Sequence, residues 1–319
     1  MRRVPIPVLF VLAATLSVVR PPDVYARDGV AVIIEIRPNA GQVQVKRADE
    51  TAWRPAEPLL TLRPGDQVNV VRDARVTLAF IGNRGTRVLG ASDSPFAVSD
   101  VSRNPSHKAW EAVGKVVEFL IGVRRESASI PVSVRQGPSM QVVILSPRDT
   151  RLMPGPINFE WSGSEGIRYR IRLTGPDGRV WEASELPYGQ TSYPPESPSL
   201  LLGVRYHWQL EAPNVSTQRA YFEILNPDQA DQVRAVLDQL GSPEVSDGSH
   251  TSVAILKSSF LFQQGLYSAA RKELTSGVVK DPAEPTLHFI LGLLYEHVGL
   301  MEMAGQEFLQ ARDLTNRGE

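Results

Sequence analysis

Histidine supplies many general bases and metal ligands, so the histidines are the first residues to test for chemistry. The chain holds five, scattered over three regions: His107, His207, His250, His288 and His297. His288 and His297 are nine residues apart on one expected helix, which is not the i, i+4 spacing of a ligand pair. Asp231 and Asp238 share an expected helix face, but a charged, solvated helix explains them. We therefore expect no metal site from these residues.

Motifs that assemble catalytic groups or phosphate sites do not occur in their required context. The sequence lacks a Gly-x-Ser-x-Gly nucleophile turn, a His-Glu-x-x-His zinc motif, a P-loop and a Gly-x-Gly-x-x-Gly loop. No spaced series of Asp and Asn predicts a calcium loop either. The sequence therefore predicts a protein that is not an enzyme, with no catalytic residue, no metal and no cofactor.

Composition narrows the class of protein further. The 319 residues include no cysteine, which excludes disulfides, thiolate metal centres, cysteine nucleophiles and a lipid carried on an amino-terminal cysteine. A formal net charge of -1 gives no electrostatic case for binding nucleic acid. With 42% hydrophobic residues the chain can build packed cores, and its length suggests two or three domains.

The first 26 residues have the pattern of a secretory signal peptide. Arg2 and Arg3 precede an apolar run over 8–19, and Val24-Tyr25-Ala26 suits a cleavage site. The run is shorter than the roughly twenty residues that cross a bilayer as a helix, and no later stretch approaches that length. We expect cleavage after Ala26 and export, most simply to the periplasm. An uncleaved membrane anchor is the alternative.

Short alternating segments over 30–101 predict a β domain with one buried face per strand. The expected strands cover 30–36, 42–47, 67–71, 75–80 and 86–89. Asp66 follows Pro64 and Gly65 between two of these strands, where it is typical of a turn rather than of a binding site.

Two segments of this domain resemble the core of the FecR-like domain. They are Leu-Arg-Pro-Gly-Asp-Gln-Val at 62–68 and Ala-Arg-Val-Thr-Leu-Ala-Phe at 74–80, although Asn83 and Arg84 stand where that family usually has Asp-Gly. In the family the domain occurs in regulators that relay an iron-siderophore signal across a membrane, and also in exported proteins without a signalling partner. The resemblance implies a compartment and a β fold. The sequence contains no internal transmembrane helix for such a relay.

A helix is expected over 105–125, with Ser106 as its cap and apolar residues on one stripe. The stripe contains Trp110, Val113, Val117, Leu120 and Ile121. We expect this face to pack on the preceding β domain, and a partner-binding helix is the alternative. Residues 126–138, with two prolines and several small polar residues, indicate a linker.

Seven short strands are expected over 139–226, at 140–145, 157–162, 168–174, 179–184, 191–193, 204–211 and 219–225. This spacing predicts a β-sandwich. With Trp161 and the strand Tyr206-His207-Trp208, the segment resembles a fibronectin type III or related immunoglobulin-like domain. The resemblance implies that these aromatic residues fill a core, and the fold by itself names no function.

The helical segment 227–317 repeats with a period of 34 residues, which resembles tetratricopeptide repeats. The signature residues are Gly265, Tyr267, Ala270, Leu274 and Pro282 in the first copy, and Leu291, Gly292, Tyr295, Gly299, Ala304, Phe308 and Ala311 in the second. Two repeats are few, so a cap is needed. The helix expected at 227–240, the sandwich or a second chain could supply it.

These features together predict a non-enzymatic adaptor of the bacterial envelope that binds protein partners. Because tetratricopeptide arrays commonly hold a ligand in a groove, the resemblance places His288, Leu291 and Tyr295 at a partner surface. A purely structural cap is the competing interpretation of the repeats. Two other functions stay open: a FecR-type signal-sensing regulator of a membrane or siderophore-linked system, and a module that binds peptidoglycan or another glycan through Trp53, Trp181 or Tyr188.

Overall fold

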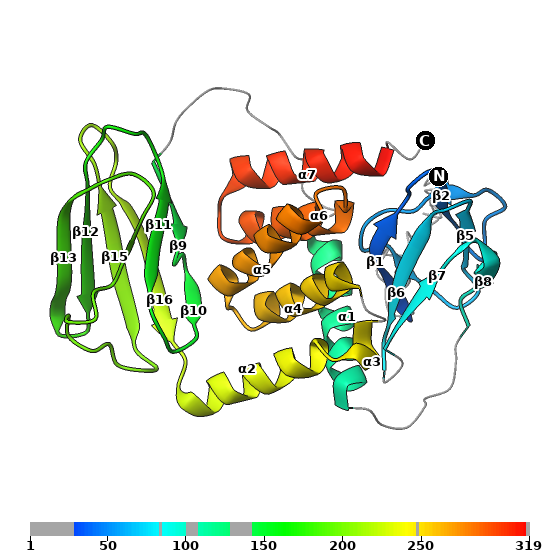
Figure 1. Cartoon of the computed structure of the whole chain (residues 1–319), viewed down its shortest axis with the longest axis horizontal. Helices are drawn as coiled ribbons and strands as arrows, with labels where there is room; N and C mark the ends of the chain where they lie inside the picture. Colours follow the sequence, from blue (N-terminus) through cyan, green and yellow to red (C-terminus); the bar gives the residue numbers. More distant parts are fainter. Residues whose placement is uncertain (1–28, 83–84, 100–107, 128–141, 247–248, 317–319) are drawn as a thin grey trace, which may run out of the picture.

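The computed structural model describes residues 29–82, 85–99, 108–127, 142–246 and 249–316. The expected signal peptide, the cap at Ser106, the turn residues Asn83 and Arg84, and all but the first two residues of the expected linker lie outside this range. Strands β1–β8 come first, followed by helix α1, strands β9–β16 and helices α2–α7 (Figure 1). The expected layout of β domains followed by a helical segment is confirmed. None of the helices in the described ranges has the length and apolarity needed to cross a membrane.

Two four-stranded sheets form the N-terminal β region, defined here as β1–β8. The strands are β1 (Ala31–Arg37), β2 (Gln42–Lys46), β3 (Arg54–Pro55), β4 (Thr61–Leu62), β5 (Gln67–Val71), β6 (Arg75–Phe80), β7 (Thr86–Leu89) and β8 (Phe96–Ala97). One sheet has the order β4-β1-β6-β7 and the other β3-β2-β5-β8. Val43, Val68 and Leu78 share the core between them. The apolar residues that alternate along these strands therefore point into the core between the two sheets.

Asp66 stabilises the turn before β5. Its carboxylate accepts hydrogen bonds from the amides of Arg63, at 2.9 Å, and Ala48, at 3.1 Å, and pairs with the Arg47 guanidinium at 2.7 Å. Only 1% of the residue is exposed. This buried anion is compensated by local donors, in agreement with the structural role expected for Asp66.

Helix α1 (Lys108–Ser127) covers the outer face of the first sheet. Val113, Val117 and Leu120 are buried and belong to one core cluster with Val32 and Ile34 of β1 and with residues of the later helices. The apolar stripe therefore packs on the preceding β domain, as expected. Strand β1 is buried on both faces because its other side chains, such as Ile33, point into the core between the sheets.

A five-stranded and a three-stranded sheet form the central β region, defined as β9–β16. The strands are β9 (Val143–Ser146), β10 (Thr150–Leu152), β11 (Asn158–Ser162), β12 (Tyr169–Gly175), β13 (Gly178–Leu186), β14 (Gln190–Ser192), β15 (Arg205–Glu211) and β16 (Gln218–Ile224). Their orders are β10-β16-β15-β12-β13 and β14-β11-β9. Phe159, Trp161, Tyr206 and Trp208 are buried, as expected for core aromatics. The Trp208 indole donates a hydrogen bond to the Pro147 carbonyl at 2.7 Å.

Six helices complete the chain: α2 (Pro227–Leu240), α3 (Pro243–Ser246), α4 (His250–Gln263), α5 (Tyr267–Lys280), α6 (Pro285–His297) and α7 (Met301–Asn316). Helix α2 has the predicted bounds and begins with a capping box of Asn226 and Gln229. The pairs α4–α5 and α6–α7 form two consecutive helical hairpins, and α2 and α3 pack against the first.

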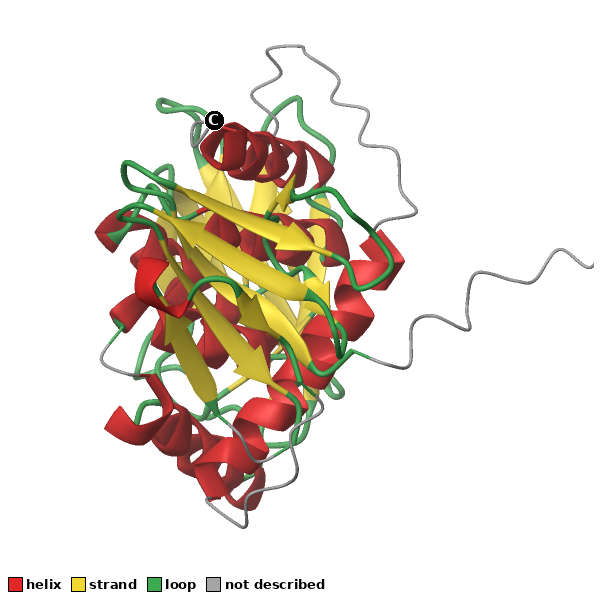
Figure 2. Cartoon of the chain, turned by 90° about the vertical axis from the view of Figure 1, so that its right-hand side faces the viewer, coloured by secondary structure: helices red, strands yellow, loops and turns green. Residues whose placement is uncertain are grey.

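The hairpins stand between the two β regions (Figure 1). The start of α4 and the turn between α5 and α6 contact the N-terminal β region, through pairs such as Arg37 with Asp281 at 3.1 Å. The turns at the other end of both hairpins contact the central β region, for example by the Arg151 amide and the Gly265 carbonyl at 2.8 Å. In Figure 2 the strands of the N-terminal β region lie in front of the helices. The hairpins thus separate the two β regions and contact both of them.

Candidate binding cleft

The residues expected to line a partner groove are inside the structure. His288, Leu291 and Tyr295 are 7%, 2% and 4% exposed. The His288 ring lies 2.7 Å from the Glu307 carboxylate through Nδ1 and 3.2 Å from the Pro282 carbonyl through Nε2. A ligand cannot contact these three side chains in this arrangement, so we place the candidate site elsewhere.

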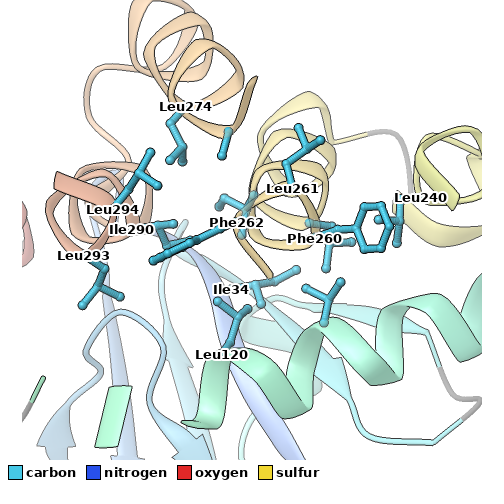
Figure 3. Packing of buried hydrophobic residues seen from close by; sticks show 14 of the residues in the cluster. Ile34, Leu120, Leu240, Phe260, Leu261, Phe262, Leu274, Ile290, Leu293 and Leu294 are labelled. Carbon is cyan, nitrogen blue, oxygen red and sulfur yellow. The ribbon is translucent and has the colours of Figure 1, made fainter. Parts of the chain in front are cut away.

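The chain itself also covers the other face of α6, which carries Ile290 rather than His288. Figure 3 shows Ile34 of β1 and Leu120 of α1 directed toward the side chains of α4 and α6, including Phe262 and Ile290. The Phe119 and Phe262 rings meet edge to face, with centroids 5.3 Å apart. This packing removes apolar surface from water and also supplies the cap that two repeats require. Helices α1 and α2 and strand β1 together provide it.

The repeat-signature residues have packing roles. Gly265 and Gly299 take φ values of +73° and +77° in the turns after α4 and α6, a region that favours glycine. A Cβ on Gly292 would lie 2.6 Å from the Phe308 ring, so this glycine permits the close crossing of α6 and α7. The remaining signature positions are buried small or apolar residues, a helix-flanking proline and a partly buried tyrosine: Ala270, Leu274, Ala304, Ala311, Pro282 and Tyr267.

One loop of the central β region contacts both of these glycine turns. The Thr150 hydroxyl donates to the Gly265 carbonyl at 3.1 Å, next to the bond from the Arg151 amide. The Arg148 guanidinium donates from Nε to the Val298 carbonyl at 2.7 Å, beside the second turn. Carbonyls that the helix ends leave unpaired are thereby satisfied. The central β region is thus joined to both hairpins at equivalent positions.

A cleft of about 510 Å³ opens where α1, α2 and α4 meet; we call it the α1–α2–α4 cleft. Its floor is apolar and consists of Ala112, Leu225, Val233, Val236 and Phe260. These residues come from three separate parts of the sequence. The cleft therefore forms only when the first β region, its helix and the later helices are assembled.

Side-chain amides surround this floor. They belong to Gln229, Gln232 and Gln239 on α2 and to Gln263 and Gln264 at the end of α4. Gln229 is engaged in the cap of α2. The side chains of the other four make no hydrogen bond within the described part of the chain. The spacing of the α2 glutamines along one helix face is visible in the sequence, but nothing there indicates what lies opposite.

The charged residues of the cleft nearly balance. The Lys115 ammonium lies 2.9 Å from the Glu111 carboxylate, one helical turn away on α1. Arg151 contributes a further cation, and its guanidinium donates to the Gln264 carbonyl at 3.2 Å. The cleft therefore suits an uncharged ligand with both hydrogen-bonding and apolar parts.

A second polar cluster lies at the contact between β1 and the helices. Glu284 is 1% exposed, and its carboxyl group accepts from the Ile36 amide at 3.1 Å and 3.2 Å and caps α6 through the Thr286 amide at 3.0 Å. Burial, with the nearby Glu35 carboxylate, raises the pKa of Glu284 to about 8. Glu35 accepts from the hydroxyl groups of Ser249 and Ser252. These groups satisfy one another, so the cluster is a junction rather than a reaction centre.

The described residues contain no group of three or more His, Asp or Glu that could hold a metal. Asp231 pairs with Arg234 on the surface of α2, as a solvated helix face should. Of the aromatics considered for glycan binding, Trp53 belongs to the N-terminal β region, while Trp181 and Tyr188 belong to the central one. Trp181 stacks on Phe159, with ring centroids 5.5 Å apart, and only Tyr188 is as much as 46% exposed.

Comparisons with known proteins add no family assignment. No protein-family model matches the chain, and no curated protein matches it. The candidate site therefore rests on the geometry of the chain itself.

Proposed function

We propose that this protein is an exported, non-enzymatic adaptor that binds a protein partner of the bacterial envelope in the α1–α2–α4 cleft. The observation that carries the proposal is the cleft itself: an apolar floor surrounded by glutamines, of which all but Gln229 make no side-chain hydrogen bond in the described part of the chain. Export follows from the expected signal peptide and its cleavage after Ala26. The junctions at both ends of the hairpins support a scaffold in which the cleft keeps its shape.

We also infer three domain families for the assembly: FecR-like for the N-terminal β region, fibronectin type III-like for the central one, and tetratricopeptide for the hairpins. The strands at 67–71, 75–80 and 86–89 and the turn at Asp66 support the first. The buried Trp161 and Trp208 support the second. The third is supported by two hairpins whose turn glycines, Gly265 and Gly299, are 34 residues apart.

Site-specific photo-crosslinking in intact cells tests the adaptor function. A benzophenone amino acid replaces Gln232 or Gln263, which are exposed at the cleft, and in a matched control it replaces Gln306, which is exposed on α7. We expect a discrete crosslinked envelope protein from both cleft positions and none from Gln306. Crosslinks of equal yield from all three positions, or from none, would contradict the proposal.

A signal-sensing regulator is the second candidate. It is favoured by the direct contact of β1 with α4 and α6, since a ligand that moved β1 would also move the helices. This function requires a membrane partner that receives the change. Co-purification of a membrane protein with the native chain, lost when a Lys replaces Ile36, would favour it over the adaptor; retention of that protein by Ile36→Lys would not.

A further inference from the structure

We propose that the α1–α2–α4 cleft recognises an extended, uncharged peptide segment by hydrogen bonds from its glutamine side chains to the peptide backbone. The inference rests on the proposed adaptor function and adds the chemistry of the segment that is bound. It predicts what the partner presents: four or five residues without secondary structure, with apolar side chains toward the floor.

Glutamine matches a peptide bond in hydrogen-bonding capacity. Its side-chain carbonyl can accept from a backbone N–H group, and its NH₂ group can donate to a backbone carbonyl. Gln232 and Gln239 on α2 face the cleft together with Gln263 and Gln264 from α4. Amides thus approach the same space from two helices. An extended peptide lying between the two helices can form hydrogen bonds along both of its edges, and its backbone N–H and C=O groups need such partners once they are buried.

The length of the cleft sets the length of the segment. Gln229 and Gln239 mark the ends of the amide row on α2 and are ten residues apart. At 1.5 Å per residue this row is about 15 Å long. An extended chain advances about 3.3 Å per residue, so four or five residues span the row. Alternate side chains of such a segment would point toward Val233 and Val236, which lie between the glutamines on α2.

Charge and aromatic content separate a peptide from other ligands. Glu111 and Lys115 neutralise each other at 2.9 Å, which leaves Arg151 as the net cation of the lining; one cation falls short of the several that hold a phosphate backbone. Among the described residues that line the cleft the one aromatic is Phe260, and it is 8% exposed. A sugar ring would therefore find no aromatic surface on which to stack. Of the floor residues Val236 is only partly buried, so it offers the apolar contact for an aliphatic side chain.

Peptide titrations followed by NMR test the proposal on the full mature chain. The probes are end-blocked pentapeptides in which Val or Leu alternates with Ser, and the same peptides with N-methylated backbone amides. We expect the unmethylated probes to shift the side-chain NH₂ resonances of Gln232 and Gln263 while leaving those of Gln306 unchanged. N-methylation removes the backbone donors, and we expect it to weaken binding at least tenfold.

Substitution of the amides gives the reciprocal test. Gln232→Leu and Gln263→Leu keep side chains of similar size, and each should weaken the unmethylated probe by about two- to tenfold, the effect of one hydrogen bond. Gln306→Leu is the matched control and should leave the affinity unchanged. Far-UV circular dichroism and the unfolding midpoint show whether each variant is folded. Equal binding of methylated and unmethylated probes, or an equal loss in Gln306→Leu, overturns the inference.

The two proposals fail in different ways. If cleft crosslinks identify a protein partner but backbone methylation has no effect, the adaptor function stands and recognition by glutamine is wrong. If chitotetraose shifts the same resonances and the peptides do not, the cleft binds glycan and both proposals are wrong.

Discussion

Replacement of Glu284 by Gln should remove a large part of the pH dependence of folding. The carboxyl group is buried where β1 meets α6 and holds the Ile36 and Thr286 amides. Burial and the neighbouring Glu35 carboxylate keep its pKa near 8, against 4.5 for an ordinary glutamate. Gln has the same shape and an acceptor oxygen but no charge. The substitution therefore changes the titration while keeping most of the packing.

The sign and size of the effect follow from proton linkage. Below pH 4.5 the folded and unfolded chains both hold the proton on Glu284. Above that pH the unfolded chain releases it and the folded chain does not, so the free energy of unfolding falls until the pH reaches about 8. This interval, at about 1.4 kcal/mol per pH unit, corresponds to a loss of at most about 5 kcal/mol. In Glu284→Gln this contribution is absent.

Urea unfolding between about pH 5 and pH 9 measures the effect, with Glu273→Gln as the control because that glutamate is exposed on α5. The native chain and the control should lose stability as the pH rises, and Glu284→Gln should lose markedly less. Hydrogen exchange of the Ile36 amide gives a local readout of the same junction. If the stability curves of the native chain and Glu284→Gln are parallel over this range, the argument from burial is refuted.

Two further predictions concern the hairpins. Gly292→Ala places a methyl group against Phe308 and should lower the free energy of unfolding by about 1–3 kcal/mol. Gly122→Ala on α1 is the control: nothing lies within 4 Å of its Cβ, so it should raise that free energy by about 0.5–1 kcal/mol. Urea unfolding compares the two variants, and equal effects would contradict the packing role of Gly292. Arg148→Ala removes the hydrogen bond to Val298 and should cost about 1–2 kcal/mol, with faster amide exchange in the α6–α7 turn. Unchanged exchange there would argue against docking through Arg148.

Local pattern was sufficient to locate most strands and helices. The strands β5, β6 and β7 and the helix α2 have the bounds expected from period and caps, because each buries one face and the alternation of Val68 and Val70 or of Val76 and Leu78 records it. Strand β10 was not expected. It has three residues, Thr150 to Leu152, and pairs in parallel with β16, so its position depends on partners 72 residues away in sequence.

The location of the site could not be predicted in the same way. Tyr295 lines a small cavity with Leu145 and Arg148, about 150 residues earlier in the chain, and His288 is buried against Glu307 of the next helix, α7. The repeat period gives the shape of each hairpin but not what packs on it. The α1–α2–α4 cleft likewise requires Ala112, Val233 and Phe260 to meet, and no spacing within one element records that.

Because the hairpins touch a β region at each end, the length of their helices fixes a distance. Helices α4 and α5 have 14 residues each, or about 21 Å at 1.5 Å per residue. One added turn in both helices would lengthen the hairpin by about 5.4 Å. Neither the contact of Asp281 with Arg37 at one end nor that of Gly265 with Arg151 at the other would persist over such a distance. A further hairpin could pack beside these two without this penalty. The length of the helices in each hairpin, however, must match the distance between the two β regions.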